Sequence, residues 1–168
     1  VRSVSAMKMV GMNVAADPIF TAAYNSTNAG FLIINADDPN MFSSQNEQDN
    51  RWYALHAKLP MLEPSNSQDC LDFTKEAFEL SEKYQLPIIL RTVTRINHSR
   101  SLVSLGERQE VPDKEYKKDV QRFICSPGYA YAHHPLLEEK LLGLLEEANK
   151  SSLNRVEMKG SKVGVVTA

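Results

Sequence analysis

Nine consecutive polar residues, 43–51, come shortly after GFLIIN at 30–35, one of the most apolar runs of the chain, with ADDPNMF between them. Ser44 and Glu47 have the spacing of a capping box, so the sequence predicts a helix that begins at residue 44 and ends near 57. A helix N-terminus offers free N–H groups and partial positive charge, which suit an anion or a developing oxyanion. The residues that would lie there are Ser43, Ser44 and Gln45. The alternative is a well-capped surface helix without a ligand.

A second group of candidates lies in RTVTRINHSR, at 91–100. Its basic residues are Arg91, Arg95, His98 and Arg100. Arginine can hold a carboxylate through two parallel hydrogen bonds, and histidine can transfer protons near neutral pH. The same residues could equally form a basic turn on the surface.

Other candidates are weaker. Gly11, within KMVGMN, lies at a predicted strand-to-helix turn, where the backbone can approach a ligand closely, but a purely structural glycine fits as well. His133 and His134 stand before a proline and indicate a helix start, and His56 fits a structural role near a helix C-terminus. The sequence contains no dinucleotide-binding motif, no P-loop, no serine-hydrolase motif and no zinc motif.

These candidates depend on alternating strands and helices to position them. Short apolar runs at 30–36 and 86–93 predict buried strands. A helix is expected over 13–25, regular from Asp17 because Pro18 fits only a first turn. The alternation predicts an α/β fold with a mainly parallel sheet flanked by helices and right-handed crossovers. Ligands of such sheets bind beyond the carboxyl ends of the strands. The loops expected at that one edge are 7–13, 36–44 and 93–100.

The rest of the chain has a different character. LPMLEP predicts a short strand, and Ser65 with Gln68 repeats the capping-box spacing before a helical apolar stripe. From 101 to 132 the pattern dissolves into charged sequence, and 134–150 predicts a helix. We therefore expect three parts, which are residues 1–100, a surface excursion with helix and linker at 101–161, and the first strand of a following domain at 162–168.

Composition narrows the class of protein. The 168 residues are 42% hydrophobic and 24% charged, with a net charge of −2, which argues against a nucleic-acid partner or an anionic membrane surface. No apolar run reaches the length of a membrane span. Cys70 and Cys125 stand far apart without metal-ligand spacing, which fits free thiols in a reducing compartment and predicts a cytoplasmic protein.

Three segments together resemble a known family. They are MKMVGMNVAADPIFTAAY, ADDPNMFSSQNEQDNRWYALHAKLPMLEPS and LPIILRTVTRINHSR. They resemble the α subunit of indolepyruvate:ferredoxin oxidoreductase, in the pyrimidine-binding (Pyr) domain for thiamine diphosphate. The resemblance covers nearly the whole chain and implies a Pyr domain that is incomplete at its N-terminus.

The resemblance implies an activity, cofactors and partners. Such enzymes oxidatively decarboxylate arylpyruvates with coenzyme A and pass the electrons to ferredoxin. Thiamine diphosphate, Mg²⁺ and iron–sulfur clusters serve the full-length enzyme, which contains a β subunit. No cofactor site is expected to be complete within this chain, and no activity is expected of it alone.

The resemblance also carries residues. The positions that match the cofactor-binding loops are Lys8, Gly11, Asn13, Asp37, Asp38, Ser43 and Gln48, and those that match catalytic positions are Ser44, Gln45, Arg95 and His98. No residue is expected to bind a metal. The family's activating glutamate lies upstream of the matched segments, so no acidic residue of this chain receives that role.

Two departures keep alternatives open. The family commonly has a histidine where this chain has Met9, and another where it has Phe42. One alternative is therefore an enzyme of the same superfamily that acts on pyruvate or another 2-oxoacid. A second is a non-catalytic assembly module with the same fold.

Overall fold

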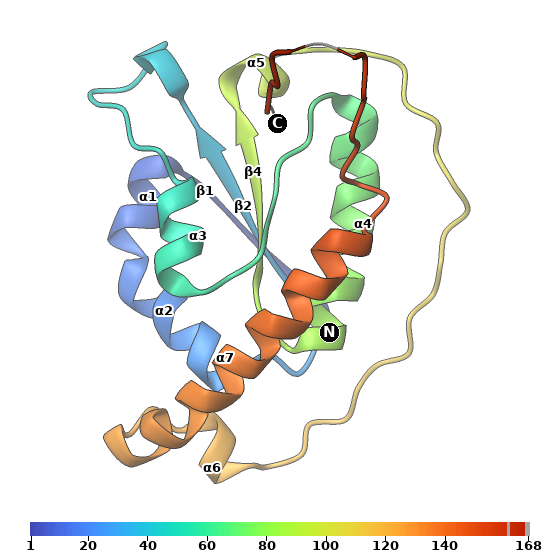
Figure 1. The fold of residues 1–168 in the computed structure, drawn as a ribbon. Coiled ribbons are helices and arrows are strands. Elements are labelled where there is room, and N and C mark those ends of the chain that lie inside the picture. Colours follow the sequence, from blue (N-terminus) through green and yellow to red (C-terminus); the bar gives the residue numbers. More distant parts are fainter. Residues whose placement is uncertain (161, 167–168) are drawn as a thin grey trace.

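A four-stranded parallel sheet forms the centre of the computed structural model, which describes residues 1–160 and 162–166 (Figure 1). The strand order is β1-β2-β4-β3. The strands are β1 (Ser3–Lys8), β2 (Phe31–Asp37), β3 (Met61–Leu62) and β4 (Ile88–Val93). Every pairing is parallel, so the carboxyl ends of β1, β2 and β4 lie at one edge of the sheet. This confirms the predicted α/β class.

The two central strands are buried on both faces, which explains their continuous apolar sequences. In the register of the sheet, Leu32 lies between Val4 of β1 and Ile88 of β4. Its side chain and that of Ile88 are fully buried, whereas Val4 on the edge strand is 52% exposed. The apolar run of β2 thus predicts a central strand, and the Ser-rich sequence of β1 fits an edge.

Helix α4 (Ser67–Tyr84) covers one face of the sheet. Ala77 packs there against Leu32, Ile88 and Leu90, and Phe73 lies at the rim of this cluster. The helix begins at Asn66, whose side chain accepts a hydrogen bond from the N–H of Asp69. The predicted helix is confirmed, with a cap one residue later than the predicted Ser65.

Four helices cover the other face. They are α1 (Met9–Val14), α2 (Ala16–Asn25), α3 (Arg51–Ala57) and α7 (Pro127–Lys150). Their buried side chains pack on Ile33 and Ile89 of the sheet. The members of this cluster from the helices are Met12, Ile19, Ala23, Ala54, Ala57, Leu137 and Leu144.

The segment after β1 is a helix, although the sequence predicted a loop at 7–13. Lys8 ends the strand and α1 begins at Met9, with Gly11 in its interior. A Cβ atom on Gly11 would lie 2.9 Å from the Cβ of Met7, closer than real Cβ contacts. Gly11 therefore lets α1 pack against the strand it follows, a structural role that the sequence left open.

The predicted helix start at residue 44 is wrong. The helix begins at Arg51, and residues 42–49 form an irregular loop. The Ser44 hydroxyl donates to the carboxylate of Asp38 at 2.5 Å, and Glu47 accepts from the N–H of Asn40 at 2.7 Å. Both side chains of the predicted capping box are therefore used elsewhere.

Two further boundaries differ from prediction. Helix α7 begins at Pro127 and includes Pro135, so His133 and His134 lie inside it and not at its start. Residues Thr94–Asn97 form a short helix, α5, within the loop predicted at 93–100.

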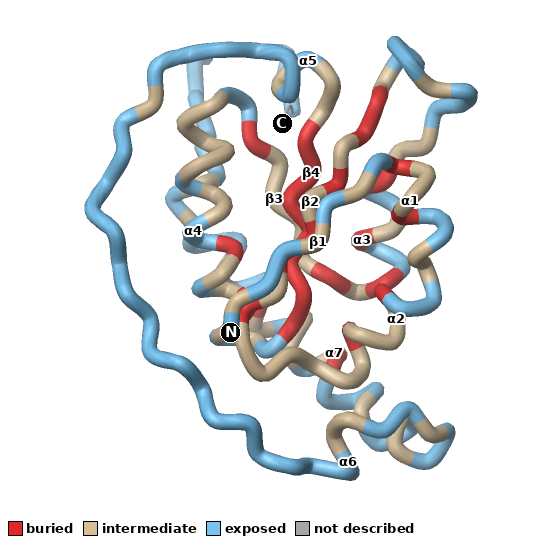
Figure 2. The backbone as a smooth tube through the Cα atoms, turned by 180° about the vertical axis from the view of Figure 1, so that it is seen from behind, coloured by how far each residue is buried: buried red, intermediate tan, exposed pale blue. Residues whose placement is uncertain are grey.

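The 101–119 segment has no helix or strand and runs along the outside of the molecule from α5 to α6 (Val120–Phe123) (Figures 1 and 2). Residues 162–166 carry no strand, while 161, 167 and 168 lie outside the described residues, so a following strand at 162–168 stays a prediction. None of the described helices combines the length and apolar composition of a membrane span.

Candidate functional site at the carboxyl edge of the sheet

Asp38 organises the edge at which β1, β2 and β4 end. It follows β2 directly and is 4% exposed. One oxygen accepts from the N–H of Ser43 at 2.9 Å and from the Ser44 hydroxyl at 2.5 Å. The other accepts from the Thr94 hydroxyl at 2.6 Å and from the N–H of Phe42 at 3.2 Å. One carboxylate therefore joins the serine–glutamine loop, residues 42–49, to the start of the arginine–histidine segment, residues 94–98.

These donors stabilise the charged form of Asp38. The hydroxyl of Ser44 contributes most, followed by that of Thr94 and the N–H of Ser43, and together they hold the pKa of the carboxyl well below its usual value. The side chain is therefore a permanent anion near neutral pH. A permanently charged, fully bonded carboxylate suits a structural anchor and not a proton carrier.

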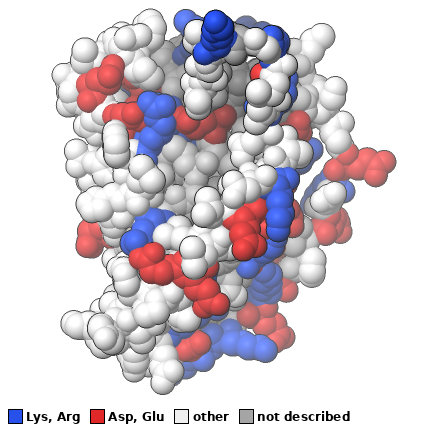
Figure 3. All heavy atoms as spheres, viewed as in Figure 1, with Lys and Arg blue, Asp and Glu red and all other residues white. Residues whose placement is uncertain are grey.

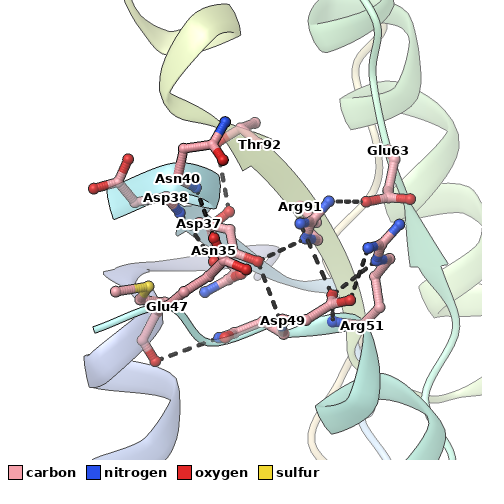
Figure 4. Close-up of polar contacts among 12 residues, drawn as sticks. Asn35, Asp37, Asp38, Asn40, Glu47, Asp49, Arg51, Glu63, Arg91 and Thr92 are labelled. Atoms are coloured by element: carbon pink, nitrogen blue, oxygen red, sulfur yellow. Dashed lines mark hydrogen bonds and ion pairs between the residues drawn. The ribbon is translucent and has the colours of Figure 1, made fainter. Parts of the chain in front are cut away.

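The neighbouring Asp37 lies deeper and forms a buried ion pair (Figure 4). Its carboxylate accepts from Nε of Arg91 at 2.8 Å and from the N–H of Asn50 at 3.1 Å. Asp37 and Arg91 come from adjacent strands and are 2% and 7% exposed. Through Asn50, this pair fixes the end of the 42–49 loop where α3 begins.

Arg91 also connects the sheet with β3 and the loop. Its guanidinium donates to Glu63, which follows β3, and lies 3.9 Å from a carboxylate oxygen of Asp49. Asp49 in turn accepts two hydrogen bonds of 2.7 Å from Arg51, and this bonding lowers its pKa. Charges therefore alternate across the edge, as Figure 4 shows.

Two asparagines lie below this network. Asn35, in β2, is fully buried, and neither polar atom of its side chain has a hydrogen-bond partner in the described structure. Asn50 is also fully buried, and its side chain donates to the carbonyl of Met9 at 3.3 Å while its own oxygen has no described partner. Buried amides usually have partners, so these atoms have unused hydrogen-bonding capacity near the site.

The predicted site residues of the loop lie around Asp38 to different degrees. Lys8 donates to the carbonyl of Ser43 at 2.9 Å, which joins the end of β1 to the loop. Gln48 donates to Asn46 at 3.0 Å and has a buried oxygen without a described partner. Gln45 is exposed. Lys8, Ser43 and Ser44 therefore belong to one cluster with Asp38.

The remaining predicted residues are less well fixed. Arg95 and His98 lie in or just after α5, at the same edge, and both side chains are exposed. Asn13 is exposed on α1, and Gly11 is packed against Met7. The structure thus brings the serine–glutamine loop and the arginine–histidine segment to one edge through Thr94.

A thiamine diphosphate cofactor needs a carboxylate at its aminopyrimidine, and five acidic residues lie at this edge. Each one already accepts hydrogen bonds from protein donors. The acids concerned are Asp37, Asp38, Glu47, Asp49 and Glu63. The edge therefore assigns no described residue to the activating carboxylate. Within residues 1–160 and 162–166, no cluster of histidine, cysteine and acidic side chains is arranged to hold a metal ion.

Sequence reasoning missed part of the site. It named Arg91 among the basic residues of 91–100, which could hold a carboxylate or form a surface turn, and did not select Thr94, Asn35 or Asn50. A signal existed for Arg91, since a lone charge inside the apolar strand run IILRTV requires a buried partner. Asn35 gives the same signal within FLIINAD.

A doubly covered parallel sheet with a polar carboxyl edge is the architecture of cofactor-binding α/β domains. The sequence profile of one such class, described as "Pyruvate flavodoxin/ferredoxin oxidoreductase, thiamine diP-bdg", matches residues 10–140. The chain belongs to this thiamine diphosphate-binding family.

Individual proteins similar to this chain carry narrower descriptions than the family. Subunit IorA of indolepyruvate oxidoreductase from Methanothermobacter thermautotrophicus is 48% identical over 171 residues, which is 100% of this chain and 28% of that protein. IorA from Archaeoglobus fulgidus is 44% identical over 98% of this chain and 27% of its own length. A 2-oxoglutarate synthase subunit KorA from Methanothermobacter marburgensis is 31% identical over 44% of this chain and 20% of its own length. The chain thus spans about a quarter of the length of the two IorA proteins.

Proposed function

We propose that this chain forms part of the thiamine diphosphate site of an oxidoreductase that acts on arylpyruvates, of which indolepyruvate is the expected substrate. The supporting observation is the similarity to IorA proteins over the entire chain, together with a polar edge built on Asp38. Coenzyme A accepts the acyl group and ferredoxin accepts the electrons in this proposal.

The parts that this chain lacks are proposed to come from the rest of the complex. A β subunit, Mg²⁺ for the diphosphate and iron–sulfur clusters would complete the enzyme. Both described cysteines, Cys70 and Cys125, are free thiols, which supports a cytoplasmic location. We expect the 168 residues alone to have no activity.

Thiamine diphosphate, when bound, supplies the electron sink for decarboxylation. The protein's own residues then bind, orient and exclude water. Asp38 accepts hydrogen bonds from the N–H of Ser43 and the hydroxyl of Ser44, and these bonds fix the position of the loop at the edge. Lys8 is bound to the Ser43 carbonyl and brings a positive charge to the same side. We assign these residues to shaping the wall that faces the cofactor.

Gln45, Arg95 and His98 are proposed to contact the substrate. All three are exposed, and among residues 1–160 and 162–166 none of their side chains has a hydrogen bond that would have to be broken first. An arginine suits the substrate carboxylate, and a histidine suits a proton transfer. Gly11 and Asn13 are proposed to approach the cofactor from α1.

The alternative substrate remains a 2-oxoacid other than an arylpyruvate, supported by the weaker similarity to 2-oxoglutarate synthase. Met9, whose replacement of a histidine motivated this alternative, is fully buried, whereas Phe42 is 69% exposed at the edge. Phe42 is therefore the position from which an altered substrate preference would come.

Substrate profiling tests the proposal. The full-length protein is purified with its partner subunit, and ferredoxin reduction is measured with coenzyme A and indolepyruvate, phenylpyruvate, pyruvate or 2-oxoglutarate. The proposal expects kcat/KM to be highest for an arylpyruvate. A higher value for pyruvate or 2-oxoglutarate would support the alternative, and no reduction with any substrate would support a non-catalytic module.

A further inference from the structure

A pocket of about 660 Å³ lies at the end of the sheet opposite to Asp38. Its walls come from the end of α2, the turn between α4 and β4, α6 and the first half of α7. Residues 26–30 lead into β2, so they lie at its amino end, whereas Asp38 follows its carboxyl end. Figure 1 shows the corresponding separation between α6 and α5.

Two cationic side chains line this pocket. Nζ of Lys140 donates to the hydroxyl of Ser26 at 2.7 Å, and Nη2 of Arg122 donates to the carbonyl of Thr27 at 2.6 Å. Both acceptors are neutral. Among the described carboxylates, none forms an ion pair with either cation, so the two charges are not neutralised.

The positive charge of Arg122 acts on Lys140. Lys140 is half-buried, and its pKa is lowered, first by burial and then by the positive charge of Arg122. A lysine that gains a carboxylate partner shows the opposite direction. The pocket therefore holds a positive charge that lacks a counter-anion.

The acids of the pocket do not supply that counter-anion. The side chain of Asp119 caps α6 and accepts from the N–H of Arg122 at 3.0 Å. Glu139 is exposed. Neither contributes to the shift at Lys140, which burial and Arg122 account for.

Two local features add to this arrangement. His133 lines the pocket, and its buried Nδ1 atom has no hydrogen-bond partner within the described structure. Ser26 has φ 65° and ψ 169°, a conformation that suits glycine and is strained for other residues. Such strain concentrates at ligand clamps, and here it positions the partner of Lys140.

Apart from Gln85 and Gln121, the remaining walls are apolar or aromatic. They include Ala23, Leu136 and Leu137 with the rings of Tyr24 and Tyr129. Sites for small molecules combine mostly apolar walls with a few convergent polar groups, which is the composition seen here.

We propose that this pocket binds a small organic anion with an apolar body, whose carboxylate or phosphate lies between Lys140 and Arg122. The site is independent of the carboxyl edge, and it needs neither thiamine diphosphate nor catalysis.

Isothermal titration calorimetry on the full-length protein tests the proposal with benzoate as the probe. Lys140→Met and Arg122→Gln should each weaken benzoate binding by at least about tenfold, a difference of about 1.4 kcal/mol. The matched control Lys150→Met changes an exposed lysine of the same helix and should leave the affinity within about twofold. Benzamide, which lacks the charge, should bind at least about tenfold more weakly than benzoate.

The proposal is overturned if benzoate does not bind, if both pocket variants bind it as the parent does, or if benzamide binds equally well. Circular dichroism verifies that each variant is folded. Should Lys140→Met fail to fold, Arg122→Gln decides the question, because α6 has only four residues and none of them is buried.

Discussion

Asp38 is the residue on which the site depends most directly. Hydroxyls from Ser44 and Thr94 reach its carboxylate from two segments that are 50 residues apart in the sequence. An asparagine has nearly the same shape but presents an N–H₂ group to donors, which leaves hydrogen bonds unmade. In the full-length enzyme, Asp38→Asn should weaken apparent thiamine diphosphate affinity by on the order of tenfold, measured by activity against cofactor concentration. The exposed-site control Asp72→Asn should not change it.

The same carboxylate predicts an acid response. The pKa of Asp38 is lowered in the folded state, so the unfolded chain binds its proton more readily. Its stabilising contribution is therefore complete above the ordinary aspartate value of about 4 and is lost as the pH falls further toward the folded-state value. Acid unfolding followed by circular dichroism should begin at a higher pH for Asp38→Asn than for the parent. Superimposed curves would contradict the role of Asp38.

Ser44 is proposed to anchor the loop and Gln45 to contact the substrate. Ser44→Ala removes a hydrogen bond to Asp38, whereas Gln45→Ala removes an exposed side chain without described partners. The double variant in the intact enzyme should lower kcat/KM for indolepyruvate by about tenfold or more. Gln109→Ala, an exposed glutamine of the 101–119 segment, is the control. Unchanged kcat/KM in the double variant would end the assignment of this loop to the substrate.

The buried pair of Asp37 and Arg91 predicts a large stability effect. Arg91→Met leaves a carboxylate buried without its partner, which costs about 3–5 kcal/mol in the free energy of unfolding. Arg51→Met breaks an exposed pair and should cost less than about 1 kcal/mol. Urea denaturation of the full-length protein measures both. Equal losses would show that the Asp37–Arg91 pair does not hold the edge.

At the scale of elements, α1 depends on close contact with β1. Gly11→Ala places a Cβ atom 2.9 Å from that of Met7, so the helix must shift, at a cost of about 1–3 kcal/mol in the free energy of unfolding. Gly128→Ala, in the first turn of α7, meets no atom within 4 Å and should be neutral or slightly stabilising. Thermal unfolding compares the two. A neutral Gly11→Ala would show that the contact is not tight.

The strands could be predicted from the sequence because their burial is encoded locally. The runs at 30–36 and 86–93 became β2 and β4, and LPMLEP contains β3. The start of α3 at Arg51 could not be predicted in this way. Ser44 and Glu47, the expected capping residues, instead bind Asp38 and the N–H of Asn40, and that competition depends on tertiary structure.

The site, like the fold, could be predicted from the sequence only in part. Parallel strands place their loops at one edge, so the meeting of the 36–44 and 93–100 loops follows from topology. The roles of Thr94 and Asn50 do not follow from topology, because they depend on individual hydrogen bonds between distant segments.

At the scale of the whole molecule, charge is dispersed. On the face drawn in Figure 3, Lys and Arg side chains lie beside Asp and Glu and do not gather into one basic patch. This agrees with the net charge of −2. The unpaired cations near α6 are therefore an exception.

The lowered pKa of Lys140 predicts how the stability of the whole molecule depends on pH. Its pKa lies below the ordinary 10.5, so the unfolded state binds more protons between the two values, and stability rises with pH in that window. Lys140→Met should remove this rise and should raise the free energy of unfolding near neutral pH by up to roughly 1 kcal/mol. Urea denaturation at several alkaline pH values measures it. An unchanged pH dependence would mean that Lys140 is not desolvated.

Hydrogen–deuterium exchange tests the central claim most directly. The full-length protein is compared with and without thiamine diphosphate and Mg²⁺, and exchange is followed by peptide mass spectrometry. The account predicts slower exchange at 37–50 and 93–98, the segments joined by Asp38, and no change at 119–140. Unchanged exchange at 37–50 and 93–98 in the cofactor-bound protein would contradict the assignment of this edge to the cofactor site.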